Sequence, residues 1–138
     1  MQLALRDDAL SSTERGFELR VGLPWIRSLP LAGLSELTVV VDGQTLEDGE
    51  LGVALGERHV TPGSLAEDRD TWWYLQDRLV VAGPRRLAPG RHAVSVDFRI
   101  VVPYLPGGPD APLVLPTHLE AVLDLDHPVV LSAARDVS

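Results

Sequence analysis

The chain has 138 residues, of which 45% are hydrophobic and 23% are charged. This composition is typical of a folded globular protein, and the length suits one domain, which we expect to span residues 1–138. The 20 acidic and 12 basic residues give a formal net charge of −8. Phosphate recognition needs clustered lysine and arginine, so we expect no nucleic-acid partner. Because cysteine is absent, disulfides and cysteine-ligated metals are excluded.

The sequence shows no sign of membrane targeting. No segment approaches the run of about 18 apolar residues that a membrane-spanning helix needs. The first residues, MQLALRDD, lack the basic segment and the long apolar run of a signal peptide. We therefore expect no membrane partner and a cytoplasmic location.

Short runs of alternating apolar and polar residues predict a series of β-strands. The first covers residues 17–23 and stops at Pro24. Residues 37–41 form a nearly continuous apolar strand, and the following Asp42-Gly43 pair is typical of a hairpin turn with positive φ. Further strands are expected at residues 51–55, 58–61, 72–75, 78–81 and 119–125.

Residues 92–104 carry the clearest strand pattern, after a turn at Pro89-Gly90. Strict period two predicts a long, half-buried strand. His92, next to the turn, is expected to be exposed, and Tyr104 is assigned to the core by its parity. One face holds Val94, Val96, Phe98, Ile100, Val102 and Tyr104, and the other holds Ser95, Asp97, Arg99 and Val101.

The remaining segments are expected to be irregular. Residues 103–116 contain five prolines and two glycines, which predicts a loop that breaks the sheet. Residues 64–69 fit one helical turn, with Ser64 as N-cap and Glu67 three residues later. About seven to nine short strands joined by turns indicate an all-β fold, an antiparallel β-sandwich of jelly-roll or immunoglobulin-like type.

The histidines raise the question of a metal site. His118, Glu120, Asp124 and Asp126 share strand parity and would project from one face. Zinc, however, needs three or four converging ligands, and a solvated acidic face opposite a leucine face accounts for the same residues. We therefore expect no metal-binding residue and no cofactor in this chain.

No catalytic constellation is recognisable either. The acidic clusters at residues 47–50 and 67–70 lie in polar segments, where the raised pKa of a glycosidase acid is not expected. A nucleophile elbow and a glycine-rich phosphate loop are both absent. We expect no catalytic residue in this chain.

Aromatic and apolar residues outside the strand pattern suggest an interface. Trp72 and Trp73 are adjacent, so on a strand one faces the core and the other faces outward, either as an interface anchor, as a sugar-stacking platform or as an ordinary surface aromatic. Trp25 and Tyr104 both lie at strand exits beside prolines. The apolar run before Pro116 needs cover, either from another chain or from its own sandwich. The predicted partner interface comprises Trp72, Trp73, Leu105, Leu113, Val114 and Leu115.

The order of these pieces resembles a known family. GFELRVGLPWIRSLPLAGLSELTVVVDGQ, at residues 16–44, is followed by Trp72-Trp73, by the strand PGRHAVSV and by PYLP. The sequence from residue 16 to 106 is similar in this order and spacing to the small β subunit of the bacterial C-glycoside deglycosidases.

The resemblance implies a β-sandwich subunit that pairs with a larger TIM-barrel α subunit, similar to sugar isomerases, in a hetero-oligomer. In that family the barrel holds a divalent metal, usually manganese, and the acid and base residues. The substrates are 3-oxo aromatic C-glycosides, such as flavonoid C-glucosides, whose C–C bond breaks by β-elimination. This chain would then be the non-catalytic subunit of a carbon–carbon lyase. The alternatives are a stand-alone carbohydrate-binding sandwich and a purely structural sandwich attached to another complex.

Overall fold

The computed structural model describes residues 5–23, 25, 27–47, 49–55, 58–67, 71–74, 78–108 and 111–126. This part of the chain contains β-strands and two short 3-10 helices, so the all-β prediction is confirmed. Neither of these helices has the length or the apolar character of a membrane-spanning segment. The elements are β1 (Leu10–Ser12), β2 (Phe17–Gly22), β3 (Leu29–Pro30), η1 (Leu31–Gly33), β4 (Leu34–Val41), β5 (Gln44–Leu46), β6 (Gly52–Leu55), β7 (Arg58–Val60), η2 (Pro62–Glu67), β8 (Trp72–Trp73), β9 (Arg78–Gly83), β10 (Arg91–Gly108) and β11 (Ala111–Asp124).

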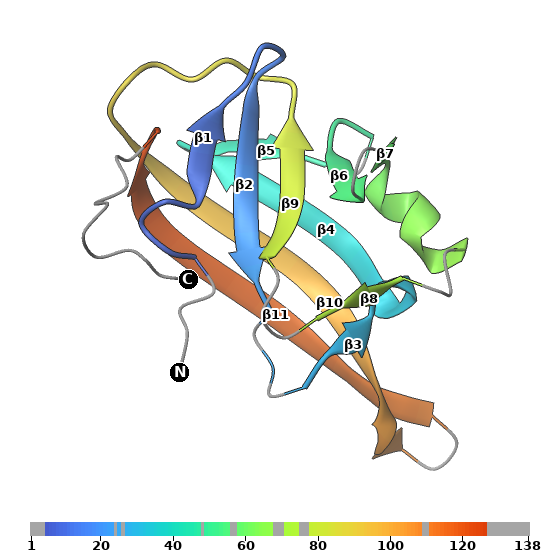
Figure 1. Ribbon diagram of the computed structural model, residues 1–138. Coiled ribbons are helices and arrows are strands. Elements are labelled where there is room, and N and C mark those ends of the chain that lie inside the picture. Colours follow the sequence, from blue (N-terminus) through green and yellow to red (C-terminus); the bar gives the residue numbers. More distant parts are fainter. Residues whose placement is uncertain are drawn as a thin grey trace, which may run out of the picture.

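Two antiparallel sheets form the predicted sandwich. The five-stranded sheet has the order β1-β2-β9-β6-β7, and the four-stranded sheet has the order β11-β10-β4-β5. A third, two-stranded sheet pairs β3 with β8. The strands of the two main sheets cross at an angle, and β10 and β11 continue past the end of the five-stranded sheet (Figure 1). One end of the hairpin therefore projects beyond the sandwich.

The core lies between the two main sheets, where the period-two patterns place apolar side chains. In β10, the residues from Val94 to Val102 that share parity are at most 3% exposed, so the predicted register is correct. The Trp73 ring contributes to the same core, with its centroid 5.9 Å from that of Phe98. At the other end, a Cβ atom on Gly83 would lie 2.4 Å from the Phe17 ring, so only glycine fits there.

The predicted hairpin at Asp42-Gly43 is confirmed between β4 and β5. Both turn residues have positive φ, 50° for Asp42 and 82° for Gly43. Two successive positive φ values are the signature of a type I′ turn, whose twist matches that of the flanking strands. The turn fixes the register Val41↔Gln44.

The loop predicted at residues 103–116 is wrong, because residues 103–108 and 111–116 belong to the far half of the paired strands β10 and β11. The two strands pair from Arg91↔Asp124 to Gly108↔Ala111, with register shifts on either side of Pro106. Strand β11 is an edge strand, and β4 pairs with β10 only as far as Ile100. Prolines are tolerated in such positions because an edge strand does not need every N–H for the ladder.

The helical turn predicted at residues 64–69 begins earlier than expected. Helix η2 starts at Pro62 and has 3-10 geometry, so Ser64 lies inside it. The Ser64 hydroxyl donates a hydrogen bond of 2.8 Å to the carbonyl oxygen of Thr61 and therefore does not act as an N-cap. Its partner in the expected capping box, Glu67, is the last residue of the helix.

Candidate functional site

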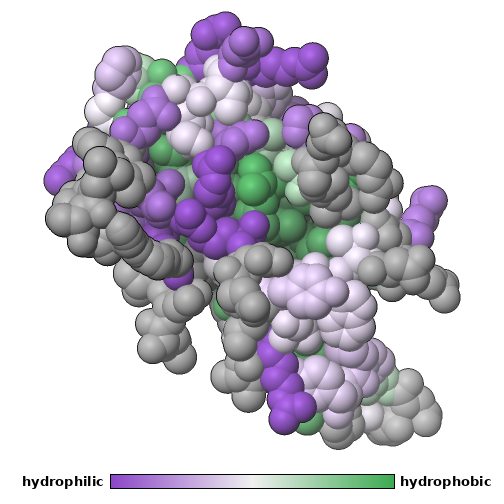
Figure 2. Space-filling model, viewed as in Figure 1, coloured by the Kyte–Doolittle hydropathy of each residue, from purple (hydrophilic) through white to green (hydrophobic). Residues whose placement is uncertain are grey.

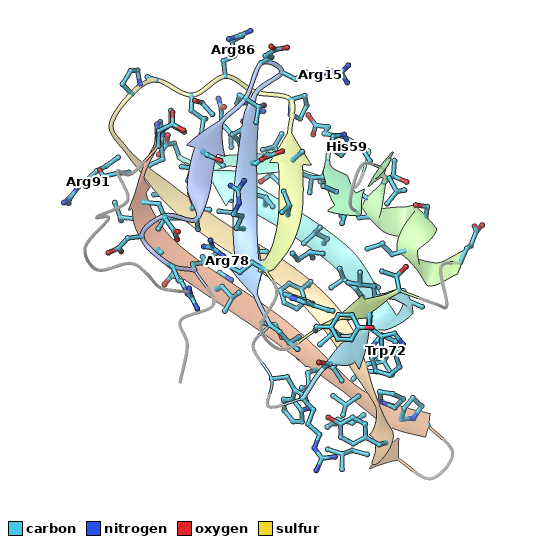
Figure 3. All side chains as sticks on the ribbon, viewed as in Figure 1. Arg15, His59, Trp72, Arg78, Arg86 and Arg91 are labelled. Carbon is cyan, nitrogen blue, oxygen red and sulfur yellow. The ribbon has the colours of Figure 1, made fainter. Side chains whose placement is uncertain are left out.

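The two adjacent tryptophans of β8 point in opposite directions, as predicted. Trp73 is 2% exposed and belongs to the core, whereas Trp72 is 43% exposed. Strand β8 pairs with β3 through Leu29↔Trp73 and Pro30↔Trp72. Of the two indoles in the predicted interface, only Trp72 is presented at the surface (Figure 3).

Tyr104 was expected in the core, and this expectation is wrong. The residue is 47% exposed, because β10 has by then run past the opposing sheet and the register has begun to shift. Its hydroxyl oxygen accepts a hydrogen bond of 2.6 Å from Nε1 of Trp25. The Arg27 guanidinium lies 5.8 Å from the centre of the Tyr104 ring, within range of a cation–π contact.

The non-core aromatic residues gather at one end of the molecule. Three of the seven aromatic residues, Phe17, Phe98 and Trp73, are buried. The other four lie on or directly after β8, in the segment before β3 or on the projecting half of β10, near the lower right of Figure 1. In Figure 2 the same end is a pale surface that projects from the body. We call this surface the aromatic end and define it by Trp25, Arg27, Trp72, Tyr74 and Tyr104.

The apolar run of the hairpin is divided between two faces. Leu113 and Leu115 are half-buried and pack against the core, whereas Val114 is 40% exposed. Leu105, on the opposite strand, is 38% exposed. The two leucines of β11 face inward because side chains alternate along a strand. Of the hairpin residues in the predicted interface, Val114 and Leu105 are therefore the ones at the surface.

The four residues of the candidate metal face do not converge. His118 lies opposite Asp97 in the ladder, and its Nδ1 is 2.6 Å from an Asp97 carboxylate oxygen. The hydrogen bond to Asp97, followed by that to Glu120, raises the pKa of His118. Asp124 lies within 3.5 Å of Arg91, while Asp126 accepts hydrogen bonds from Ser12. The described ranges contain no group of three or more histidine and carboxylate side chains that could hold a metal ion.

His92 is buried, contrary to the prediction that it would be exposed. The residue is 7% exposed, and its ring lies between Asp42 and the carbonyl group of Ala88. The hydrogen bond to Asp42 is the main reason why the pKa of His92 is raised. Its partner lies 50 residues away in the sequence, and both of its ring nitrogens are occupied inside the fold.

A groove of about 540 Å³ crosses the outer face of the five-stranded sheet. Its lining includes the small residues Gly52, Ala82 and Gly83 together with Glu18 and His59. Figure 3 places His59 and Arg15 at this side of the molecule, away from Trp72. The described residues that line the groove include no tryptophan, tyrosine or phenylalanine, the side chains that most often stack on sugar rings.

Comparison with known proteins identifies the family. Residues 4–104 match the C-glycoside deglycosidase beta subunit family. The chain belongs to this family. It is 37% identical over 101 residues to the 3'-dehydrocarminate deglycosidase beta subunit of a Microbacterium species, covering 72% of this chain and 76% of the relative. It is 29% identical over 93 residues to the C-glycoside deglycosidase beta subunit of Eubacterium cellulosolvens, covering 66% of this chain and 63% of that relative.

The part of the chain that matches the C-glycoside deglycosidase beta subunits contains the whole aromatic end. The last residues of β10 and the whole of β11 lie beyond it. The interface predicted from the sequence shares Trp72 with the aromatic end, and the fold brings Trp25, Arg27, Tyr74 and Tyr104 to the same end of the molecule. In the sequence Trp25 and Tyr104 each follow a proline, but Tyr104 lies within β10, and nothing local indicates that the two side chains pair.

Proposed function

We propose that this chain is the small, non-catalytic subunit of a cytoplasmic C-glycoside deglycosidase. The observation that carries this proposal is membership of the beta subunit family over residues 4–104. Both relatives are named beta subunits, which implies a partner subunit. The enzyme is then a hetero-oligomer in which the chemistry takes place on the larger chain.

The partner in this proposal is a TIM-barrel α subunit that holds a divalent metal, with manganese as the first candidate. The reaction is a carbon–carbon lyase step on the 3-oxo form of an aromatic C-glycoside, such as a flavonoid C-glucoside. A base removes the C2 proton, which the neighbouring ketone acidifies. The electron pair forms a C1=C2 double bond, the bond from C1 to the aglycone breaks, and the aglycone carbon takes up a proton. The word dehydro in the name of the first relative supports an oxidised sugar as substrate.

The described residues of this chain fit a supporting role. His92 and His118, the two histidines whose pKa is raised, are each engaged with a carboxylate of their own subunit. The burial of His92 removes the free path to a substrate proton that a general acid or base needs. The exposed aromatic residues, by contrast, suit binding to another molecule.

Co-expression tests the proposal. The chain is produced alone and together with a TIM-barrel sugar-isomerase-like protein encoded beside it, and each sample is incubated with a 3-oxo flavonoid C-glucoside. We expect release of the aglycone, measured by liquid chromatography, only when both chains are present. Equal aglycone release by the partner alone, or no complex between the two chains, would overturn the proposal.

A stand-alone carbohydrate-binding module is the second candidate, because Trp72 and Tyr74 present exposed rings on β8 and directly after it. Aromatic rings of this kind can stack on a sugar. Calorimetric titration of the isolated chain with glucose and with flavonoid glucosides distinguishes the two functions. Sugar binding by the chain that is lost in Trp72→Ala would favour the carbohydrate-binding module. The proposed subunit function predicts no sugar binding by the chain alone.

A further inference from the structure

We propose that the aromatic end is the surface on which this subunit docks to the catalytic subunit, and that Arg27 pairs there with a carboxylate of that partner. This inference rests on the proposed function and specifies how the two chains meet. Its occupant is a partner surface that is apolar at its centre and carries at least one aspartate or glutamate.

Residue type and exposure set the aromatic end apart from the rest of the surface. Trp72, Tyr74 and Tyr104 are 43%, 53% and 47% exposed, and Trp25 is half-buried beside them in the contact with Tyr104. Tryptophan, tyrosine and arginine are the residue types that contribute most of the binding energy at protein interfaces. Here all the non-core aromatic residues of the chain occur together with one arginine.

The aromatic end is also already ordered for binding. The Trp25 indole donates its hydrogen bond to the Tyr104 hydroxyl, and Arg27 lies over the same tyrosine ring. These contacts link the segment before β3 to the projecting half of β10. Side chains that are held before association lose less conformational entropy when they bind, so a pre-organised surface binds more tightly than a flexible one of the same area.

Charge at the aromatic end differs from that of the whole chain, whose formal net charge is −8. Among the described residues of segments 25–30, 72–74, 103–108 and 111–114, the only charged side chain is that of Arg27. No carboxylate within the described ranges forms an ion pair with it. A single exposed cation in an apolar, aromatic setting fits a complementary surface with one well-placed carboxylate.

Two other surfaces are less suitable for docking a large partner. The outer face of the four-stranded sheet carries an internal network of charges, with Arg99 beside Glu36 and His118 beside Asp97. The groove on the five-stranded sheet is lined by charged residues such as Glu14, Arg15 and Glu18, and its described lining has no tryptophan, tyrosine or phenylalanine. The aromatic end lies within the residues that match the beta subunit family, and so does the groove, so residue type rather than the family match separates these two surfaces.

The experiment measures the dissociation constant between the purified catalytic subunit and variants of this chain. Trp72→Ala, Tyr104→Ala and Arg27→Glu remove the exposed indole, the ordered ring and the cation. We expect each to raise the dissociation constant by about 10-fold to 30-fold. Tyr104→Phe keeps the ring and loses only the acceptor for Trp25, so it should have a smaller effect.

Two matched controls lie away from the aromatic end. Arg15→Glu makes the same charge change as Arg27→Glu at the far side of the molecule (Figure 3). Val122→Ala truncates a side chain that is 62% exposed, on the outer face of β11. Both should bind the catalytic subunit like the unmodified chain, and the thermal unfolding of all variants is measured to show that they are folded.

The outcomes separate the docking surface from the function. If the unmodified chain binds the catalytic subunit and the three variants bind equally well, the docking surface is elsewhere and the proposed function stands. If the unmodified chain does not bind, the proposed function fails as well. If Trp72→Ala dissociates a homodimer of this chain and leaves binding to the catalytic subunit unchanged, the aromatic end serves self-association and the inference is overturned.

Discussion

Nδ1 of His92 lies 2.5 Å from a carboxylate oxygen of Asp42, and Nε2 of the same ring lies 2.6 Å from the carbonyl oxygen of Ala88. Both partners are hydrogen-bond acceptors, so the ring must donate from both nitrogens, which only the protonated imidazolium can do. The second carboxylate oxygen of Asp42 accepts from the backbone N–H of Ala93. The contact therefore joins the β4–β5 turn to the start of β10, and it depends on the charge of both side chains.

This pair predicts that the stability of the protein falls as the medium becomes alkaline. The hydrogen bond to Asp42 raises the pKa of His92 above its usual 6.5. A raised pKa in the folded state stabilises the fold fully below pH 6.5, and this stabilisation is lost as the pH rises through the folded-state pKa. We expect the free energy of unfolding in urea, followed by tryptophan fluorescence, to decrease from pH 6 to pH 8.5.

Two histidine variants separate the sources of this pH dependence. The pKa of His118 is raised by Asp97 and Glu120 in the same direction, but His118 is exposed. We expect His92→Gln to remove more of the slope than His118→Gln. The hydrogen bond from His92 lowers the pKa of Asp42 below 3.8, so its share of stability is lost only as the pH falls below that value. A slope between pH 6 and pH 8.5 that His92→Gln leaves unchanged would contradict the role of this pair.

The register of β10 predicts opposite effects for two neighbouring residues. Phe98 is 3% exposed and packs on Trp73, so Phe98→Ala should lower the free energy of unfolding by about 3–5 kcal/mol. Arg99 is exposed, and its ion pair with Glu36 lies in solvent. Arg99→Ala should therefore change stability by less than about 1 kcal/mol. Denaturant unfolding measures both values, and equal losses would show that the assigned faces are wrong.

The hairpin predicts a difference between inward and outward residues of β11. Leu113 and Leu115 pack against the core, so replacing both with serine should destabilise the fold by about 2 kcal/mol or more, because buried apolar area is lost. Val114 faces outward and is 40% exposed. Val114→Ser should leave the unfolding midpoint almost unchanged. A folded double serine variant of normal stability that no longer binds the catalytic subunit would instead make the two leucines docking residues.

The isolated chain is expected to show no activity and to bind no transition metal tightly. The protein is incubated with manganese or zinc, passed through gel filtration and analysed by mass spectrometry for metal. We expect much less than one metal ion per chain and no aglycone released from a 3-oxo C-glycoside. Retention of one metal ion per chain, or turnover by the chain alone, would contradict this expectation. Removal of metal from the assembled enzyme, in contrast, should abolish its activity.

The sequence correctly predicted strand faces and turns that depend on neighbouring residues. It did not predict burial and strand pairing that depend on residues far apart in the chain. Alternation placed Val94 to Val102 correctly, and Asp42-Gly43 predicted its hairpin, because both patterns are local. The prolines of residues 103–116 were interpreted as loop residues, since the sequence does not reveal that β11 lies at the edge of its sheet. Tyr104 has the same parity as the core residues of β10, but it lies where no opposing sheet remains to bury it.

The candidate site shows the same division. The opposite orientation of Trp72 and Trp73 follows from strand geometry and was predicted. The bond between Trp25 and Tyr104 spans 79 positions and closes only when the β3 segment folds beside β10. The burial of His92 depends equally on a turn far from it in the sequence. Long-range pairs of this kind carry no local signal, so the fold had to be known before they could be found.

Strand β10 contributes both to the core and to the aromatic end. Its first half supplies Phe98 and its neighbours to the interior, and its second half carries Tyr104 into the aromatic end. Both halves belong to one continuous ladder with β11. If the core is unfolded, the second half of β10 is therefore not held in place, and Tyr104 is not positioned at the aromatic end. On the proposed docking, only correctly folded copies can occupy the catalytic subunit. Assembly would then select folded copies of this subunit over misfolded ones.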